Sequence, residues 1–330
     1  MLNWAIIGSG DVVNRLVKNS FNVTGTSKVK YIYSDNLHQA KLLAKKYKFG
    51  AVTNSLNAIM NDNNVNSIYI ATPPNSHAFY IKKFSKVKKY ILCEKPLTIK
   101  KKELKEIINL CRKNKVSLIT SFYRRYLKRF LEIKKIVQSN KIGKIITFNY
   151  RLFHSPQTHP TAKIKKNMKN IPWRFQKKIS GGGNFLDMGA HAIDMISFLM
   201  GDIKKVQSLK KNYLKLYNVE DTLVTNIELK NKIIGQATWS SVTDKTDDLF
   251  EIFGTKGSIS FSLNFSNKVN IRKKNKNIFK NIPFDTPFHK NLILDTISKF
   301  TSYKKKNRFK IEKHGIDAAL HQFSVINSND

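Results

Sequence analysis

The chain opens with Leu2-Asn3-Trp4-Ala5-Ile6-Ile7-Gly8-Ser9-Gly10, an apolar run that ends directly in two glycines. Such a run predicts a buried β-strand, and the glycines predict a tight turn into a following helix. In that geometry backbone N–H groups and the helix N-terminus can meet a pyrophosphate. The third glycine of a G-x-G-x-x-G pattern is replaced by Val13. An ordinary strand–helix turn therefore stays open as the alternative.

The first 120 or so residues alternate short apolar runs with helical patterns, which is typical of a parallel α/β sheet. We expect strands at Trp4–Ile7, Val29–Tyr33, Ser67–Ala71, Tyr90–Cys93 and Ser117–Thr120, and helices at Leu37–Tyr47, Ser76–Phe84 and Lys102–Lys113. These elements predict a doubly wound dinucleotide-binding fold over residues 1–121.

From about Ile145 the pattern changes to longer strands of alternating polarity, which predicts an antiparallel sheet with one covered face. The strands are expected at Ile145–Phe153, Thr222–Leu229, Ile233–Val242, Phe250–Phe253 and Ser258–Ser262, with closing helices at Leu292–Phe300 and Lys313–Ile326. Two stretches, Ser155–Pro172 and Arg272–Pro283, are predicted to be loops. Residues 122–330 are accordingly expected to form a second α/β domain.

Bulk properties agree with two domains and a normal core. The chain has 330 residues, of which 41% are hydrophobic and 11% aromatic, and single cores rarely grow past roughly 250 to 300 residues. No stretch approaches the roughly 18 apolar residues of a membrane span. The first strand begins where a signal peptide would lie, and two cysteines make no disulfide framework. We therefore expect a cytoplasmic protein without a membrane partner.

The formal net charge of +38 invites a nucleic-acid interpretation. Only nine of the 60 basic residues are Arg, the residue that base and phosphate readers favour. The lysines are spread along the whole chain and interleaved with Asn and Ile, as AT-rich codons would supply. A solvated basic surface is the interpretation we favour over a specific nucleic-acid site. The nearest approach to such a site is the cluster Tyr123, Arg124, Arg125, Tyr126 and Arg129.

The residues at the end of the second predicted strand should determine whether the protein prefers NAD or NADP. An acid there binds the ribose hydroxyls and repels a 2′-phosphate. Ser34 occupies the place expected for that acid, and Asp35 comes one residue late. The sequence leaves the preference open.

The segment Ala71-Thr72-Pro73-Pro74-Asn75-Ser76-His77 ends the predicted strand at 67–71. It can be a proline-rich turn with an Asn or Ser helix cap. It can equally be a loop that closes over the nicotinamide half of a dinucleotide, and the two roles are compatible.

Two further motifs indicate chemistry. Lys95, in Cys93-Glu94-Lys95-Pro96, follows an apolar strand at the carboxyl edge where ligands bind in α/β sheets. Asp187 and His191, in Gly181-Gly182-Gly183-Asn184-Phe185-Leu186-Asp187-Met188-Gly189-Ala190-His191, stand four residues apart, on one face of a helix. The glycines would let backbone approach a ligand closely. A metal site from His154, His159, Asp187 and His191 is an alternative, but the spacings match no zinc pattern, and we expect no metal.

In order along the chain, IIGSG, ATPPNSH, CEKPLT, WRF, GGGNFLDMGAHAID and FEIFGTKGSI resemble the glucose–fructose oxidoreductase / inositol dehydrogenase (Gfo/Idh/MocA) family. The resemblance covers nearly the whole chain, and the layout is loosely similar to 1,5-anhydrofructose reductase-like sugar dehydrogenases. It implies a Rossmann domain followed by an α/β domain with a large, mostly antiparallel open sheet, often used for homo-oligomerisation. It implies catalytic roles for Lys95, Asp187 and His191. The cofactor-binding residues we expect are Gly8, Ser9, Gly10, Asp11, Val12, Ser34, Asp35, Thr72, Pro73, Asn75, His77, Glu94, Lys95, Arg124, Trp173 and Arg174.

The expected activity is hydride transfer between NAD or NADP and a hydroxyl or ketone carbon of a sugar, cyclitol or sugar derivative. His191 would be the general acid/base, because its unperturbed pKa of about 6.5 suits proton transfer near neutrality. Asp187 would orient His191, and Lys95 would polarise the reacting oxygen. A catalytically silent NAD(P)-binding regulator is the alternative, although such a protein usually loses the Lys/Asp/His set. The stretch from His154 to Pro172 is expected to face the substrate.

Overall fold

The computed structural model describes residues 1–155, 171–183, 185–274 and 276–327, and it divides the chain into two compact units. The first unit consists of residues 1–126 and 285–319, and the second of residues 127–284 and 320–330. The segment 285–319, which follows the second unit's sheet in sequence, therefore folds with the first unit. A single division of the chain at residue 121 does not describe this return.

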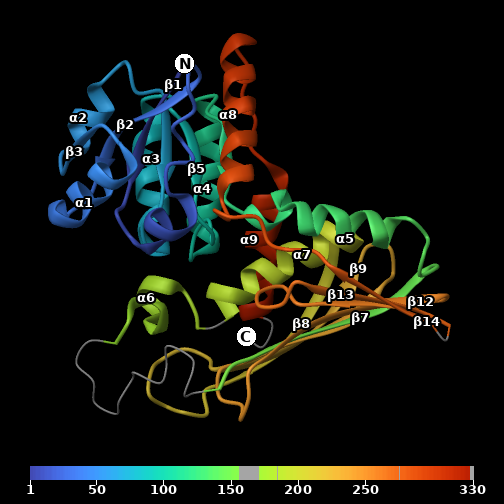
Figure 1. The fold of residues 1–330 in the computed structure, drawn as a ribbon. Coiled ribbons are helices and arrows are strands. Elements are labelled where there is room, and N and C mark those ends of the chain that lie inside the picture. Colours follow the sequence, from blue (N-terminus) through green and yellow to red (C-terminus); the bar gives the residue numbers. More distant parts are fainter. Residues whose placement is uncertain (156–170, 184, 275, 328–330) are drawn as a thin grey trace. The chain divides into compact units, whose positions relative to one another are not determined.

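The first unit contains a six-stranded parallel sheet (Figure 1). Its strands are β1 (Leu2–Ile7), β2 (Ser27–Tyr33), β3 (Ala51–Thr53), β4 (Ser67–Ile70), β5 (Tyr90–Cys93) and β6 (Leu118–Thr120). Their order, β3-β2-β1-β4-β5-β6, reverses between β1 and β4. Ligands of such sheets bind outside the carboxyl ends of the strands at this reversal. The predicted Rossmann fold is confirmed.

Helices cover this sheet, and one of them comes from the returning segment. The helices are α1 (Leu37–Tyr47), α2 (Leu56–Asn61), α3 (His77–Lys86), α4 (Lys101–Lys113) and α8 (Lys290–Lys305), with short turns η1 (Val12–Val17), η2 (Pro74–Ser76) and η3 (Tyr123–Tyr126). In α8, Phe300 stacks on Trp4 of β1 at 5.7 Å and on Tyr90 of β5 at 5.0 Å. Aromatic pairs of this kind stabilise a fold by more than the burial of their apolar surface alone. The returning helix is thus part of the first unit's core.

The second unit is built on an eight-stranded sheet with the order β14-β13-β12-β11-β7-β10-β9-β8. The strands are β7 (Ile145–Phe153), β8 (Ile203–Lys211), β9 (Thr222–Leu229), β10 (Ile234–Ser240), β11 (Asp247–Gly254), β12 (Gly257–Phe261), β13 (Lys268–Lys273) and β14 (Lys276–Asn281). All neighbours pair antiparallel except β7 and β10, which are parallel. The large, mostly antiparallel sheet is confirmed.

Helices lie along one face of this sheet (Figure 1). They are α5 (Lys128–Gln138), α7 (Ala190–Met200) and the end of α9 (Lys313–Ile326). The unit also contains the short helix α6 (Lys177–Ser180) and the turns η5 (Trp173–Phe175) and η6 (Phe185–Gly189). Alternate residues of the strands are buried, as in Leu223, Thr225, Ile227 and Leu229 of β9. This one-sided burial is what the alternating sequence pattern predicted.

The structure contains several elements that the sequence analysis did not predict. β3, α2, α5, β8, β13 and β14 were not predicted, and β14 lies inside the stretch 272–283, which was expected to be a loop. The loop prediction at 272–283 was wrong because all six residues of β14 are exposed, so the strand has no buried face to produce an alternating pattern. Most of the other predicted loop, Ser155–Pro172, lies outside the described residues.

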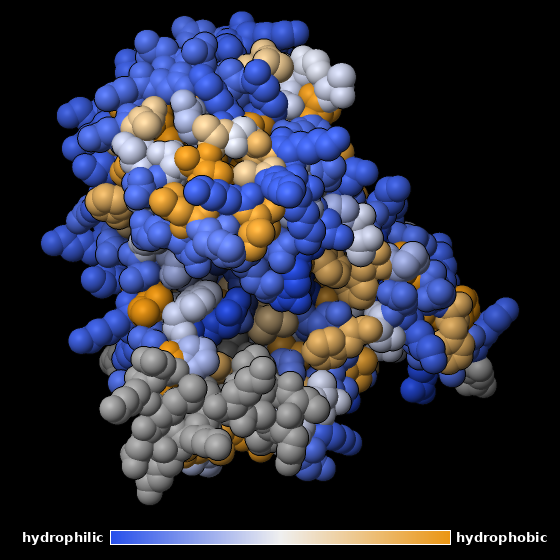
Figure 2. Space-filling model, turned by 60° about the vertical axis from the view of Figure 1, so that its left-hand side comes forward, coloured by the Kyte–Doolittle hydropathy of each residue, from blue (hydrophilic) through white to orange (hydrophobic). Residues whose placement is uncertain are grey.

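The visible surface is mostly hydrophilic, with scattered apolar patches (Figure 2). Exposed lysines occur on helices and strands of both units, which fits a solvated basic surface. Within the described residues, no helix is long and apolar enough to cross a membrane.

Candidate active site

The glycine loop lies at the sheet's reversal point. Gly8 has φ +113°, its N–H donates to Tyr33 O at 2.8 Å, and a Cβ there would lie 2.7 Å from Ala71 O. Only glycine permits this approach of β1's end to β4's end. A Cβ at Gly10 would meet no atom within 4 Å, so the backbone there is open to a ligand. Val13, in place of a third glycine, is fully buried.

The end of β2 joins the glycine loop through two hydroxyls. Ser9 Oγ lies 2.7 Å from Ser34 Oγ, and both residues are buried. Ser34 Oγ also accepts the N–H of Asn36 at 3.1 Å. Asp35, between them, is exposed. The Ser34 hydroxyl therefore links the end of β2 to the glycine loop. The Asp35 side chain is accessible to solvent or to a ribose.

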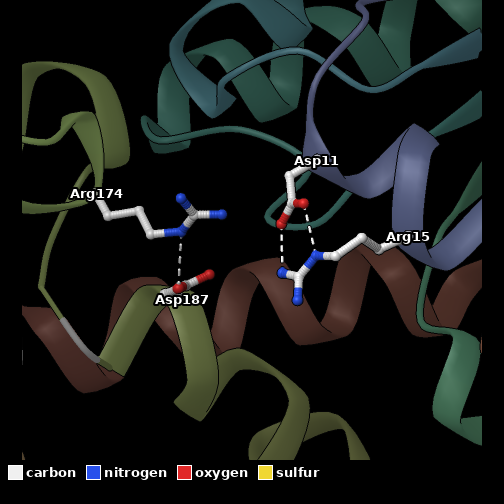
Figure 3. A network of polar contacts seen from close by, with 4 residues as sticks. All are labelled: Asp11, Arg15, Arg174 and Asp187. Carbon is white, nitrogen blue, oxygen red and sulfur yellow. Dashed lines mark hydrogen bonds and ion pairs between the residues drawn. The ribbon is translucent and has the colours of Figure 1, made fainter. Parts of the chain in front are cut away.

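Asp11 and Arg15 form an exposed ion pair at the start of η1 (Figure 3). Arg15 Nε donates to Asp11 Oδ1 at 2.6 Å, and a second guanidinium nitrogen donates to Oδ2. Exposed pairs of this kind contribute little to stability. The sequence analysis expected Asp11 and its neighbour Val12 at the cofactor but did not foresee Arg15, whose i+4 spacing was the available signal.

The loop after β4 is fixed from within. Ser76 Oγ lies 2.7 Å from Thr72 Oγ1 and 2.8 Å from Pro73 O, and it makes no side-chain hydrogen bond that caps α3. The ring nitrogens of His77, which is fully buried, lie 2.9 Å from Thr72 O and 2.8 Å from Pro96 O. Burial lowers the pKa of His77, and the hydrogen bonds to the two carbonyls oppose that shift. His77 links this loop to the Glu-Lys-Pro turn, and its side chain faces the interior.

Glu94 is a buried carboxylate at the end of β5. Its Oε1 accepts the phenol of Tyr69 at 2.7 Å and lies 3.0 Å from His289 Nε2. Burial by itself would raise the pKa of Glu94, but the charge and hydrogen bond of His289, together with Tyr69, lower that pKa to about 2. The carboxylate therefore stays ionised at neutral pH. Like His77, it was expected at the cofactor, and its side chain instead faces the domain interior.

Lys95 follows Glu94 directly and is half-buried, just beyond the carboxyl end of β5. Arg124, on η3 after the neighbouring strand β6, is buried, with its guanidinium 5.6 Å from the ring of Tyr123. Both positions lie on the edge of the sheet that the sequence analysis assigned to ligands.

In the second unit, Asp187 has a basic partner. Arg174 Nε donates to Asp187 Oδ2 at 3.1 Å (Figure 3), and the Arg174 guanidinium lies 4.5 Å from the ring of Trp173. Both members of the ion pair are about one-third exposed, at 39% and 35% of their side-chain surface. The WRF and DMGAH motifs are thus brought together by a hydrogen-bonded ion pair. The sequence analysis named all three residues but not their pairing.

His191 is buried in the first turn of α7, and Asp187 lies in the π-helical turn η6 before it. Single π-turns are frequently found at functional sites. The triple glycine has a structural reason that the sequence did not reveal. A Cβ at Gly183 would lie 2.0 Å from Glu220 O, and the Gly183 N–H donates to Glu220 Oε1 at 2.7 Å. Gly183 thus permits a close approach to Glu220, a structural role that the sequence analysis did not foresee.

Among the described residues there is no group of three or more His, Cys, Asp or Glu side chains that could hold a metal ion. One member of the alternative metal set, His159, lies outside them. His154 lies at the end of β7, with its ring 5.9 Å from that of Phe265.

The two glycines of the loop predict different outcomes when each is replaced by alanine. Gly10→Ala should leave the melting temperature unchanged, because its Cβ meets no protein atom within 4 Å. If a pyrophosphate binds at this loop, the added methyl group should still weaken NADH binding about tenfold, or ~1.4 kcal/mol. Gly8→Ala should lower both the melting temperature and the affinity. Fluorescence titration and thermal denaturation measure the two effects; unchanged NADH affinity in Gly10→Ala would contradict a pyrophosphate site there.

Comparisons with known proteins agree with this geometry. Residues 2–122 match the oxidoreductase family with an NAD-binding Rossmann fold, and residues 130–260 match the C-terminal domain of the same Gfo/Idh/MocA family. The chain is 28% identical over 290 residues to oxidoreductase P35 of Formosa agariphila, covering 87% of each chain. It is 23% identical over 261 residues to 1,5-anhydro-D-fructose reductase of Ensifer adhaerens, covering 78% of this chain and 75% of the relative.

The fold is also that of levoglucosan dehydrogenase in its complex with NADH and levoglucosan. The TM-score is 0.80 at 21% identity, over 99% of this chain and 96% of that one. With both halves matched in order, this chain belongs to the Gfo/Idh/MocA family of NAD-binding oxidoreductases.

Proposed function

We propose that this protein moves hydride between NAD(P) and a carbon that carries a hydroxyl or keto group in a sugar, cyclitol or sugar derivative. The observation that supports it most is the position of Lys95. It follows the β5 strand at the carboxyl edge of a dinucleotide-type sheet, and the open glycine loop follows β1 at the same edge. A cation at this edge can stabilise negative charge that develops on a reacting oxygen.

The first domain, residues 1–121, is proposed to hold the cofactor. The open backbone at Gly10 fits a pyrophosphate, and exposed Asp35 fits a ribose edge. Further contacts are proposed for the loop Thr72–Asn75, for Lys95, and for Arg124, Trp173 and Arg174. The bound nicotinamide would supply or accept the hydride. His77 and Glu94 contribute by holding the loops, since their side chains face inward.

Three side chains of this protein are proposed to handle the substrate oxygen and its proton. Lys95 polarises the oxygen, and His191 takes the hydroxyl proton during oxidation and returns it during reduction. Asp187 orients His191 and is itself held by Arg174. Residues 122–330 would thus carry the substrate functions, including the stretch from His154 to Pro172.

The substrate class rests on the related proteins, whose names include a 1,5-anhydro-D-fructose reductase and a levoglucosan dehydrogenase. The test is a screen of anhydrosugars, sugars, inositols and nucleotide sugars with NAD and with NADP, in both directions, followed by absorbance at the nicotinamide band. Turnover on one class that is lost in Lys95→Ala would support the proposal. NADH binding without turnover on any of them would favour the regulatory alternative.

Asp35 gives a prediction about cofactor preference. Asp35→Ala should shift the ratio of kcat/KM for the two cofactors towards NADP about tenfold, because it removes a negative charge that would repel a 2′-phosphate. Asp62→Ala, an acid of the same unit that pairs with Lys30 at 2.6 Å, is the matched control. An unchanged ratio in Asp35→Ala would mean that Asp35 does not face the ribose.

We propose a homo-oligomer formed through the second unit's sheet. Several large apolar side chains on its strands are exposed, namely Ile146, Leu209, Ile234, Phe253, Ile278 and Phe279. Large apolar side chains that are exposed on the strands of one sheet favour an interaction surface on that sheet. Light scattering after size exclusion gives the mass; a monomer at micromolar concentration would contradict the proposal. The cytoplasm is proposed as the compartment, with both buried cysteines reduced.

A further inference from the structure

The Glu94 carboxylate occupies an unusual place for a charge. It is 7% exposed, and it belongs to the residue immediately before Lys95. Taking a carboxylate out of water is costly unless partners with good geometry replace the water. Two of its partners lie far apart in the sequence: Tyr69 on β4 and His289 just before α8.

His289 connects several parts of the first unit. Its Nε2 lies 3.0 Å from Glu94 Oε1, and its ring stacks on Tyr123 at 4.6 Å with an interplanar angle of 29°. Its backbone N–H donates to Leu16 O at 3.1 Å, in the η1 turn that follows the glycine loop. His289, which is 1% exposed, therefore connects two segments. One is the turn that contains Glu94 and Lys95, and the other is η1, which follows the glycine loop.

His289 comes from a part of the sequence far from Glu94. His289 lies outside both stretches that match the family, which end at residues 122 and 260. It reaches Glu94 across 195 residues of sequence because the segment 285–319 returns to the first unit. Glu94 is further held by its backbone, whose N–H donates to Ile70 O at 2.9 Å. With backbone and side chain both fixed, the following residue has little freedom to move.

We propose that His289 is a positioning residue for Lys95: through Glu94 it fixes the Glu94–Lys95 turn to the helix that follows the glycine loop. The proposal deepens the function proposed above and rests on it for its kinetic test. In this arrangement the cofactor loop and the cationic side chain keep one fixed spacing. Misplacement by about 1 Å far from the reacting atoms can cost about 10²-fold in rate.

Two substitutions separate the contacts of His289. His289→Phe keeps an aromatic ring to stack on Tyr123 and removes the donor to Glu94, whereas His289→Gln keeps a donor and loses the stacking. We expect His289→Phe to lower kcat at least about tenfold, with the KM for NAD(P) and the NADH dissociation constant changed less than about threefold. His289→Gln should recover most of the lost kcat. A folded His289→Phe variant with kcat within twofold of wild type would overturn the proposal.

Should His289→Phe not fold, the double variant Glu94→Gln/His289→Phe removes the buried charge together with its partner. Replacing both members of a buried polar pair is tolerated far better than removing one. This variant should fold and should retain the low kcat. Recovery of wild-type kcat in it would show that the pair serves stability alone.

The path through Lys95 is tested by a double-mutant cycle. If His289 acts through Lys95, adding His289→Phe to Lys95→Ala should lower kcat no further. A second full loss of tenfold or more would mean that His289 acts elsewhere, and would overturn the proposal.

A readout independent of turnover keeps the two proposals apart. Site-resolved acylation of lysines by an N-hydroxysuccinimide ester, read by mass spectrometry, reports the surroundings of the Lys95 amine. In His289→Phe the Lys95 rate should change at least threefold, and that of exposed Lys102 on α4 should not. An unchanged Lys95 rate overturns the positioning role, whether or not a substrate has been found.

Discussion

Lys95→Ala should lower kcat about 10²- to 10³-fold, the usual loss when one preorganised donor to a developing oxyanion is removed (about 3 to 4 kcal/mol). The reason is electrostatic. A cation already in place at the carboxyl edge of the sheet needs no reorganisation when charge develops on the substrate oxygen. NADH binding should change little, because the glycine loop and β2 remain intact.

Steady-state kinetics with the substrate found by the screen, together with NADH titration, measure the two parts of this expectation. The matched control is Lys100→Ala, which removes a nearby lysine whose side chain is 69% exposed and should leave kcat unchanged. Turnover near wild type in Lys95→Ala would remove Lys95 from the proposed mechanism.

His191→Gln should lower kcat/KM for oxidation about 10²- to 10⁴-fold near neutral pH, the usual contribution of a general base. Because a base must be neutral to accept the hydroxyl proton, wild-type kcat/KM for oxidation should rise with pH through one ionisation. The rising limb should disappear in His191→Gln, while NADH affinity stays largely intact.

Asp187→Asn separates orientation from proton transfer. It should lower the maximal rate but keep the rising limb, because His191 is still present; loss of the nearby carboxylate charge should move the limb to lower pH. His38→Gln, an exposed histidine on α1, is the control for replacing a histidine. A pH profile that is unchanged in His191→Gln would identify another residue as the base, with Lys95 the first to examine.

Elements with a strong pattern could be predicted from the sequence. The bounds of α1, β5, β7, β9 and α9 agree with the prediction. The apolar residues of these segments recur with a helical period, alternate with polar residues, or form a continuous run. β14 could not be predicted, since a strand exposed along its whole length leaves no such trace. The fold class followed from the elements that do bury a face.

The candidate site was predictable in its residues and less so in its contacts. Motif positions such as Lys95 stand next to predicted strand ends, so their place at the sheet edge could be inferred. The partner of Glu94 could not, because no local rule connects residues 195 positions apart. A buried tyrosine in β4 was the available sign that a polar partner lay nearby. The close approach of Gly183 to Glu220 was likewise invisible, because sequence shows that a position is glycine but not what approaches it.

The return of residues 285–319 to the first unit has a consequence for biosynthesis. On the ribosome, residues 1–126 are complete well before that segment exists, and at ~5–20 residues per second the intervening stretch takes roughly 8 to 30 s. During this interval Glu94 lacks its imidazole, and the surface of Trp4 and Tyr90 that Phe300 later covers is open to water. The nascent N-terminal region therefore remains partly assembled, with apolar surface exposed, until residues 285–319 have been translated. A nonsense mutation shortly before codon 285 would therefore also damage the unit formed by residues 1–126.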